Sequence, residues 1–196
     1  MNPRITEITA MLRHLDGELE LEFAKRRLAL AYTVHNGKVR FEEHVLKDHR
    51  KRRSRLLGYI FAARPMMLIT APVIYSLIIP FAIIDAFVTV YQHVCFPVYA
   101  IPTVRRCEYV VFDRGALAYL NAVERLNCLF CSYANGVIGY VREVASLTEQ
   151  YWCPIKHARR IAGTHERYSG FADFGDAAAY QAELTRLREA LRHTGA

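Results

Sequence analysis

The feature that most constrains this chain is the run from Pro65 to Val104, in which Asp85 is the only charged side chain. About 20 apolar residues cross the hydrocarbon core of a bilayer, which is roughly 30 Å thick, as one helix. Residues 65–84 and 86–104 each approach that length, although the second block includes His93. Two adjacent blocks of this kind favour a membrane segment over the buried helix of a soluble protein.

A single straight helix over this run would be about 60 Å long, which is twice the thickness of the hydrocarbon core. The run must therefore break. Proline has no backbone N–H, so the candidate break points are Pro72, Pro80, Pro97 and Pro102. Two topologies remain open. In the first, the chain returns as a re-entrant hairpin or as two short spans. In the second, it crosses once and the remainder lies at the far interface.

Both flanks of the apolar run are basic, with residues 50–55 before it and Arg105 and Arg106 after it. Lys and Arg are enriched in cytoplasmic flanks. The pattern therefore favours the returning topology at a bacterial inner membrane, with both termini in the cytoplasm. Asp85 would be costly if it faced lipid. We expect it at the hairpin turn or the interface, and the alternative is a buried partner or a proton-handling site.

The 196-residue chain carries 26 Lys and Arg against 19 Asp and Glu, a formal net charge of +7. The excess is densest from Lys47 to Arg55, just before the apolar run. Anionic lipid headgroups are the expected partner, at about 1 kcal/mol for each juxtamembrane cation. Nucleic acid is not expected, because the basic run has no interleaved aromatics and no recognition motif accompanies it. Residues 1–30 also lack the apolar core of a secretory signal peptide.

The rest of the chain is expected to be mostly α-helical. Apolar residues at helical spacing predict helices over residues 4–31 and 39–64, joined by a turn at His35–Lys38 into an antiparallel helical hairpin. The expected domains are an N-terminal helical region with the basic run, the membrane segment and a helical metal-site domain. Their boundaries are 1–64, 65–104 and 105–196.

The C-terminal region is predicted to contain one short strand and several helices. Residues 108–112 suit a strand, and Asp113 suits the N-cap of a helix that ends near Cys131. Asn135-Gly136 indicates a turn or a new helix start. The further predicted helices cover residues 137–150, 154–163 and 176–192. The last of these carries an apolar stripe of Ala179, Leu184, Leu187 and Leu191.

Four residues in this region have the spacing of a metal site. Cys128 and Cys131 are spaced C-x2-C, and Cys153 and His157 are spaced C-x3-H. Three thiolates and one imidazole suit tetrahedral zinc, and iron accepts the same ligands. Four protein ligands leave no open position for substrate, so we expect the zinc to be structural and the protein not to be an enzyme.

Several other interpretations of these residues remain open. One alternative is that the cysteines form a metal-free dithiol, and another is that they are unrelated buried residues. In a further alternative, Cys107 is an additional sulfur ligand of an iron–sulfur cluster. Cys95 lies in the apolar run and is expected to be buried there. Neighbouring polar groups suit hydrogen bonds to the ligands, a carboxylate metal site or ordinary ion pairs. They are Asn121, Glu124, Glu143 and Glu149, with His157 as a fourth ligand of the carboxylate site.

The segments Tyr119–Gly136 and Glu149–His157 resemble an uncharacterised family of small bacterial membrane proteins. These proteins share the Cys-x2-Cys and Cys-Pro-Ile-Lys-His pattern, and the resemblance extends from about Val39 to the C-terminal helix. It implies a membrane protein that uses this cysteine and histidine set. It transfers no activity.

The expected function is a non-enzymatic accessory or scaffold subunit of a bacterial membrane complex, in contact with other membrane-protein subunits. The first alternative is an iron-containing electron-transfer protein with the same ligands. The second is an enzyme in which His157 activates Cys153 as a nucleophile.

Overall fold

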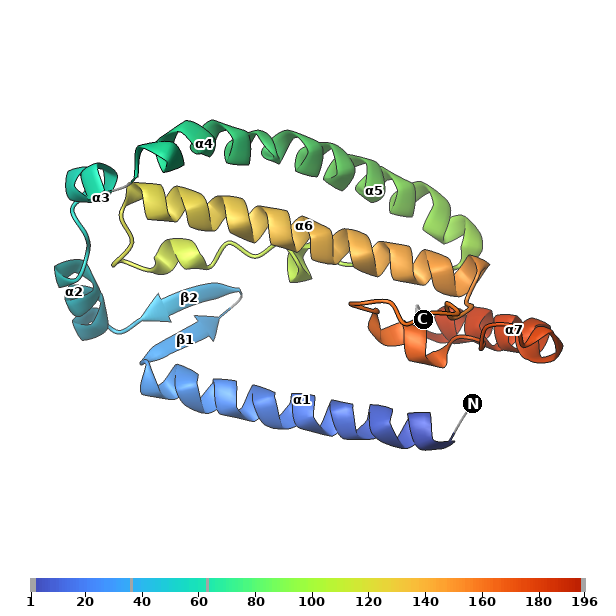
Figure 1. Ribbon diagram of the computed structural model, residues 1–196. Helices are drawn as coiled ribbons and strands as arrows, with labels where there is room; N and C mark the ends of the chain where they lie inside the picture. Colours follow the sequence, from blue (N-terminus) through green and yellow to red (C-terminus); the bar gives the residue numbers. More distant parts are fainter. Residues whose placement is uncertain (1–2, 36, 63, 195–196) are drawn as a thin grey trace. The chain divides into compact units, whose positions relative to one another are not determined.

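The structure is a computed structural model that describes residues 3–35, 37–62 and 64–194, and it is mostly helical, as predicted (Figure 1). The chain divides into two compact units, which we describe separately. We call the first the α5 unit and the second the hairpin unit. Their described residues are 3–6, 80–110 and 136–194 in the α5 unit, and 7–79 and 111–135 in the hairpin unit.

The hairpin unit takes its name from two strands, β1 (Tyr32–His35) and β2 (Lys38–Phe41), which pair antiparallel with Val34 opposite Val39. Gly37 adopts a positive φ of 71° between them, so the predicted turn is present. The predicted helical hairpin is wrong. β-branched and aromatic residues favour strands on both sides of the turn, and the rest of residues 39–64 forms two short helices, α2 (Glu43–Lys51) and α3 (Leu56–Ala62).

The helix predicted at the N-terminus is confirmed as α1 (Pro3–Ala29). Its apolar stripe is not part of a core. Among the α1 side chains that the structure describes, only that of Arg27 is partly covered. The predicted stripe residues Leu12, Leu15, Leu19, Phe23 and Leu28 are all more than half exposed.

The apolar run forms two helices, α4 (Pro65–Ser76) and α5 (Ile78–Tyr99). The break between them falls at Leu77, whose N–H donates to the carbonyl of Ile74. Pro80 lies in the first turn of α5 and has no N–H to donate back to the preceding turn. The predicted break at a proline is therefore confirmed at Pro80, whereas Pro72 and Pro97 lie inside helices.

The C-terminal end of α5 reverses the chain. Ala100 has a positive φ of 54°, and the N–H of Ile101 donates to the carbonyl of Phe96 at 2.9 Å. This is the hydrogen bond of a Schellman motif, in which the two residues it links also make an apolar contact. Phe96 and Ile101 are accordingly 0% and 5% exposed and belong to one core cluster. Residues 101–110, which we call the return segment, then run back along α5.

The return segment packs against the long helix α6 (Ala122–Trp152). The contact requires Gly136, since a Cβ at this position would lie 2.7 Å from the carbonyl oxygen of Tyr109 and 2.8 Å from the Cα of Val110. The turn predicted at Asn135-Gly136 is therefore wrong, because this glycine serves close packing inside a continuous helix. The strand predicted over residues 108–112 is also wrong, since residues 106–108 form a 3₁₀ turn and the rest is irregular.

α6 begins later than predicted. Asp113 makes no capping hydrogen bond. Asn121 and Glu124 form a reciprocal capping box instead, in which each side chain accepts a hydrogen bond from the other's backbone N–H, at 3.0 and 2.8 Å.

The last helix, α7 (Ala177–Thr194), packs on α6 as its stripe predicts, with Leu184, Leu187 and Leu191 buried. The predicted cap at Asp176 is confirmed, because its carboxylate accepts the N–H of Ala179 at 3.0 Å. The helix predicted over residues 154–163 is wrong. Those residues form a loop, and an isolated bridge pairs Ile155 with Ala172.

We expect Gly136→Ala to destabilise the protein, because two backbone atoms would have to move to admit the new methyl group. Overpacking of this kind costs about 1–3 kcal/mol. The measurement is the midpoint of chemical unfolding in detergent, followed by circular dichroism. The control is Gly17→Ala in α1, where no atom lies within 4 Å of the new Cβ. That variant should be unchanged or stabilised by about 0.5–1 kcal/mol. Equal midpoints for the two variants would contradict the close contact.

Candidate functional site

The four residues of the predicted metal site are divided between the two compact units. Cys128 and Cys131 lie in α6 within the hairpin unit, whereas Cys153 and His157 follow the end of α6 in the α5 unit. All the cysteines are free thiols. Within residues 3–35, 37–62 and 64–194, no group of three or more Cys, His, Asp or Glu side chains is placed to hold a metal ion. The Cys3His site thus stays a prediction from spacing.

The polar residues around these cysteines have other partners. The side chains of Asn121 and Glu124 form the cap of α6, and the Asn121 amide also donates to Ser54 at 2.9 Å. Glu143 pairs with Arg167 at 2.5 Å, and Glu149 lies 2.9 Å from His165. The ion-pair interpretation is thus confirmed for Glu143, whereas Glu149 makes a hydrogen bond to His165.

The apolar run carries a buried ion pair. Asp85 is 7% exposed and accepts two hydrogen bonds from the Arg106 guanidinium, Nε to Oδ1 at 2.8 Å and Nη2 to Oδ2 at 2.6 Å. This bidentate arrangement is among the stronger charge-assisted contacts. The predicted hairpin-turn position of Asp85 is wrong, because Asp85 lies inside α5, whereas the predicted interface position stays a prediction. The alternative of a buried partner is confirmed, and the return segment supplies that partner.

A second buried polar contact lies two turns further along α5. Gln92 is 1% exposed, and its side chain binds the backbone N–H of Val104 at 3.0 Å and the Val104 carbonyl at 3.2 Å. Its amide also donates to the hydroxyl of Tyr140 on α6 at 2.7 Å. Gln92 therefore joins α5, the return segment and α6 through one side chain.

α5 consequently has two faces of opposite character. Its polar face points into the unit and contains Asp85, Thr89 and Gln92. Its other face is exposed and almost entirely apolar, which is the reverse of a helix on the surface of a soluble protein. We call it the outer face of α5. Its large members are Ile83, Ile84, Phe87, Val90, Val94 and Val98, from 41% to 75% exposed.

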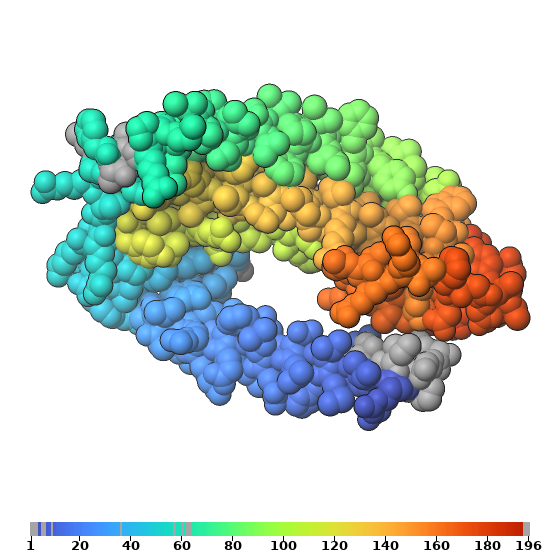
Figure 2. Space-filling view, viewed as in Figure 1, coloured from blue at the N-terminus to red at the C-terminus, as the bar shows by residue number. Residues whose placement is uncertain are grey.

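α4 shows the same excess of exposed apolar residues. Met66, Met67 and Ile69 are more than 60% exposed, and only Ala71 and Tyr75 are partly covered within the helix. Figure 2 shows the side chains of α4 and α5, in green, lying open at the surface. Pro65–Tyr99 is long and apolar enough to cross a membrane, and its most apolar 18-residue window contains no buried residue.

The α5 unit also has a polar cavity of about 330 Å³ bounded by the return segment, α6 and α7. Burial raises the pKa of Tyr109 in its wall, with a further contribution from Glu143. The charged side chains of the wall are paired with each other, Arg105 with Glu108 and Arg167 with Glu143. The cavity therefore has the character of a structural network rather than of a reaction centre.

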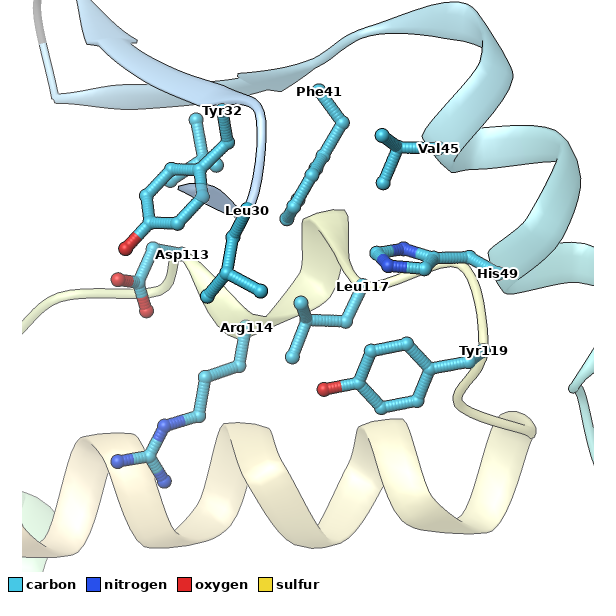
Figure 3. Close-up of a pocket in the computed structure, with 10 residues that line it drawn as sticks. Leu30, Tyr32, Phe41, Val45, His49, Asp113, Arg114, Leu117 and Tyr119 are labelled. Carbon is cyan, nitrogen blue, oxygen red and sulfur yellow. The ribbon is translucent and has the colours of Figure 1, made fainter. Parts of the chain in front are cut away.

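The hairpin unit has an apolar pocket of about 350 Å³ between its strands, α2 and residues 113–119 (Figure 3). The ring of His49 lies between Phe41 and Tyr119, with ring centroids 5.0 Å from each. Asp113 and Arg114 lie at its exposed edge. Most of the described residues that line the pocket are apolar or aromatic, so it suits the binding of an apolar group.

The loop that carries His157 is held by one ion pair and by a hydrogen bond to Tyr168. Lys156 donates to Asp173 at 2.7 Å, and this hydrogen bond lowers the pKa of the Asp173 carboxyl. His157 itself is exposed, and its backbone N–H donates to the Tyr168 hydroxyl at 2.6 Å. The exposed His157 ring also stacks on the Tyr168 ring, with centroids 6.3 Å apart.

Comparison of this chain with protein-family models, with curated proteins and with solved structures finds no match. The resemblance of the cysteine and histidine segments to a membrane-protein family therefore has no matched family model behind it.

Replacing one member of the Asp85–Arg106 pair should be strongly destabilising, and the two members should differ. Arg106→Met leaves a carboxylate whose side chain is only 10% exposed, whereas Asp85→Asn leaves a guanidinium whose side chain is 41% exposed. Breaking a buried pair costs about 3–5 kcal/mol. We expect Arg106→Met to reach that range and Asp85→Asn to fall below it, as measured by unfolding in detergent. A larger loss for Asp85→Asn would contradict this account.

Proposed function

We propose that this protein is a non-enzymatic accessory or scaffold subunit of a membrane complex, attached to the lipid bilayer through α4 and α5. One observation carries the proposal: the outer face of α5 and most of α4 are apolar and uncovered, while the polar groups of α5 point inward. Large contiguous apolar surfaces on a protein mark membrane or protein interaction sites. Lipid suits the whole length of this surface.

The charge distribution supports a membrane with anionic headgroups. α2 contains Lys47, Arg50 and Lys51, and Arg52, Arg53 and Arg55 follow before α4 begins. All six side chains are exposed and available to lipid phosphates. The basic flanks on both sides of the apolar run favour cytoplasmic termini, and hence the cytoplasmic side of a bacterial inner membrane.

The assignment as a scaffold rests on how the polar groups are used. Glu124, Glu143 and Glu149 cap a helix, hold an ion pair or make a hydrogen bond, so these carboxylates are committed to structure. α1 supplies a long helix whose apolar side chains are uncovered. A second subunit of the complex is the expected occupant of that stripe.

The attachment predicts co-flotation with vesicles. We expect the purified protein to float with vesicles that contain anionic phosphatidylglycerol, and less with purely zwitterionic vesicles. Replacing Arg52 and Arg53 together by Gln should reduce binding to the anionic vesicles, because each juxtamembrane cation contributes about 1 kcal/mol. The matched control replaces Arg186 and Arg192 of α7 in the same way. Binding that is equal on both vesicle types, or equally reduced by the control, would contradict the role of the basic run.

The structural zinc remains part of the proposal and is supported by the spacing of Cys128, Cys131, Cys153 and His157 alone. We expect one zinc per chain in elemental analysis, lost in Cys131→Ser and in Cys153→Ser and retained in Cys95→Ser. Chelation should then reduce the protease resistance of the region after the membrane segment. A metal-free protein with unchanged resistance would remove zinc from the proposal, and a coloured, iron-containing protein would favour electron transfer.

A further inference from the structure

We infer that α5 lies along the membrane surface, with its outer face in the lipid, and does not cross the bilayer. The inference rests on the proposed membrane attachment and specifies its geometry. It concerns the α5 unit alone. The observations that carry it are the split character of α5, the path of the return segment and the exposed charges beside it.

The split of α5 into two faces runs along its length. Side chains from Ile83 to Val98 on the outer face are apolar, and these two positions are separated by about 22 Å along a helix. The opposite face holds Asp85, Gln92 and Phe96 and is covered by the same unit throughout. A helix lying in the interface presents one apolar side to lipid and one polar side to water.

The return segment makes an upright α5 costly. It brings Arg106 beside Asp85, which lies fourteen residues, or about 21 Å, from Tyr99 at the end of the helix. If α5 stood upright with Tyr99 at the surface, this part of the return segment would lie deep in the hydrocarbon. Arg105 and Glu108, which are exposed, would then be at that depth as well. Charged side chains at the bilayer centre are strongly unfavourable.

The backbone of the return segment adds a second cost. Only residues 106–108 form a 3₁₀ turn, and the rest of residues 101–110 is irregular. Irregular backbone exposed to lipid leaves N–H and carbonyl groups without partners, and it does not occur in the hydrocarbon core. Along the surface, by contrast, the return segment lies on the polar side of α5 and meets water. Both costs disappear in that orientation.

α6, like the return segment, covers the inner side of α5 and carries exposed polar groups. It contacts α5, where Tyr91 and Thr148 are joined by a 3.0 Å hydrogen bond between hydroxyls. Its exposed positions within this unit include Arg142, whose guanidinium donates to the carbonyls of Gly163 and Thr164. The return segment and α6 thus expose charged groups on the inner side of α5, and the outer face is the side left to lipid.

The test measures the depth of tryptophan probes on the outer face. Trp152 is the only tryptophan, so Trp152→Phe gives a silent background. Ile83→Trp, Phe87→Trp, Val94→Trp and Val98→Trp are then made singly at exposed positions, and each variant is reconstituted into phosphatidylglycerol-containing vesicles. Quenching by lipids brominated near the headgroup is compared with quenching by lipids brominated near the chain end. Circular dichroism checks that helix content is retained.

We expect all four probes to be quenched and to report one shallow depth, because a helix along the surface keeps them level. Ala145→Trp, at an exposed position on α6, should remain unquenched. A steady change of depth from Ile83→Trp to Val98→Trp would overturn the surface orientation and show that α5 crosses the bilayer. The membrane attachment itself would then still hold. Absence of quenching in all four variants, together with failure to float, would overturn the attachment itself.

Discussion

The side chain of Gln92 is the contact on which the α5 unit depends. A buried amide must find partners for its N–H and carbonyl groups, and Gln92 finds them on Val104 and Tyr140. These partners fix the position of the return segment along α5. The Asp85–Arg106 pair holds the same two segments together nearer the start of α5. Because these contacts turn the polar side of α5 into the unit, the apolar side of the helix faces outward. The exposed apolar face is thus a consequence of polar pairing inside the unit.

The close approach of the return segment to α6 likewise depends on one residue. Glycine inside a helix costs about 1 kcal/mol relative to alanine, so its presence at position 136 needs a reason. The backbone of Tyr109 and Val110 supplies it, because the chain passes too near α6 for any side chain to fit. Hydrogen bonds from α5 and a missing side chain on α6 therefore act together to hold a segment that has little regular structure of its own.

Local signals in the sequence predicted the elements that depend on local chemistry. The stripe of α7 with its Asp176 cap, the break at Pro80 and the length of α1 could all be predicted in this way. Prediction failed where a distant contact decides the outcome. Asn135-Gly136 looks like a turn until the return segment is placed beside it. The spacing of Asn121 to Glu124 is that of a capping box, and this pair rather than Asp113 caps α6 in the structure.

The difference between local and distant contacts also explains which parts of the candidate site could be predicted. The predicted site of Cys128, Cys131, Cys153 and His157 rests on their spacing alone. Spacing does not say whether the chain folds back between the first pair of residues and the second. Here that chain is helical throughout, since α6 runs to Trp152. Conversely, the partner of Asp85 lay 21 residues away and beyond a chain reversal. A lone carboxylate in an apolar run, followed by arginines after a proline-containing turn, was the available signal for it.

The cluster of rings where α5 and α6 end gives the protein an optical property. Trp152, the single indole of the chain, lies 5.2 Å from the ring centroids of both Tyr99 and Tyr151. Tyr151 in turn lies under the guanidinium of Arg188 from α7, at 4.7 Å. Excitation of either tyrosine should pass to the indole while these three helix segments stay together. The chain thus carries an intrinsic fluorescent reporter of its own assembly, and separation of any one helix end would change its emission without an added label.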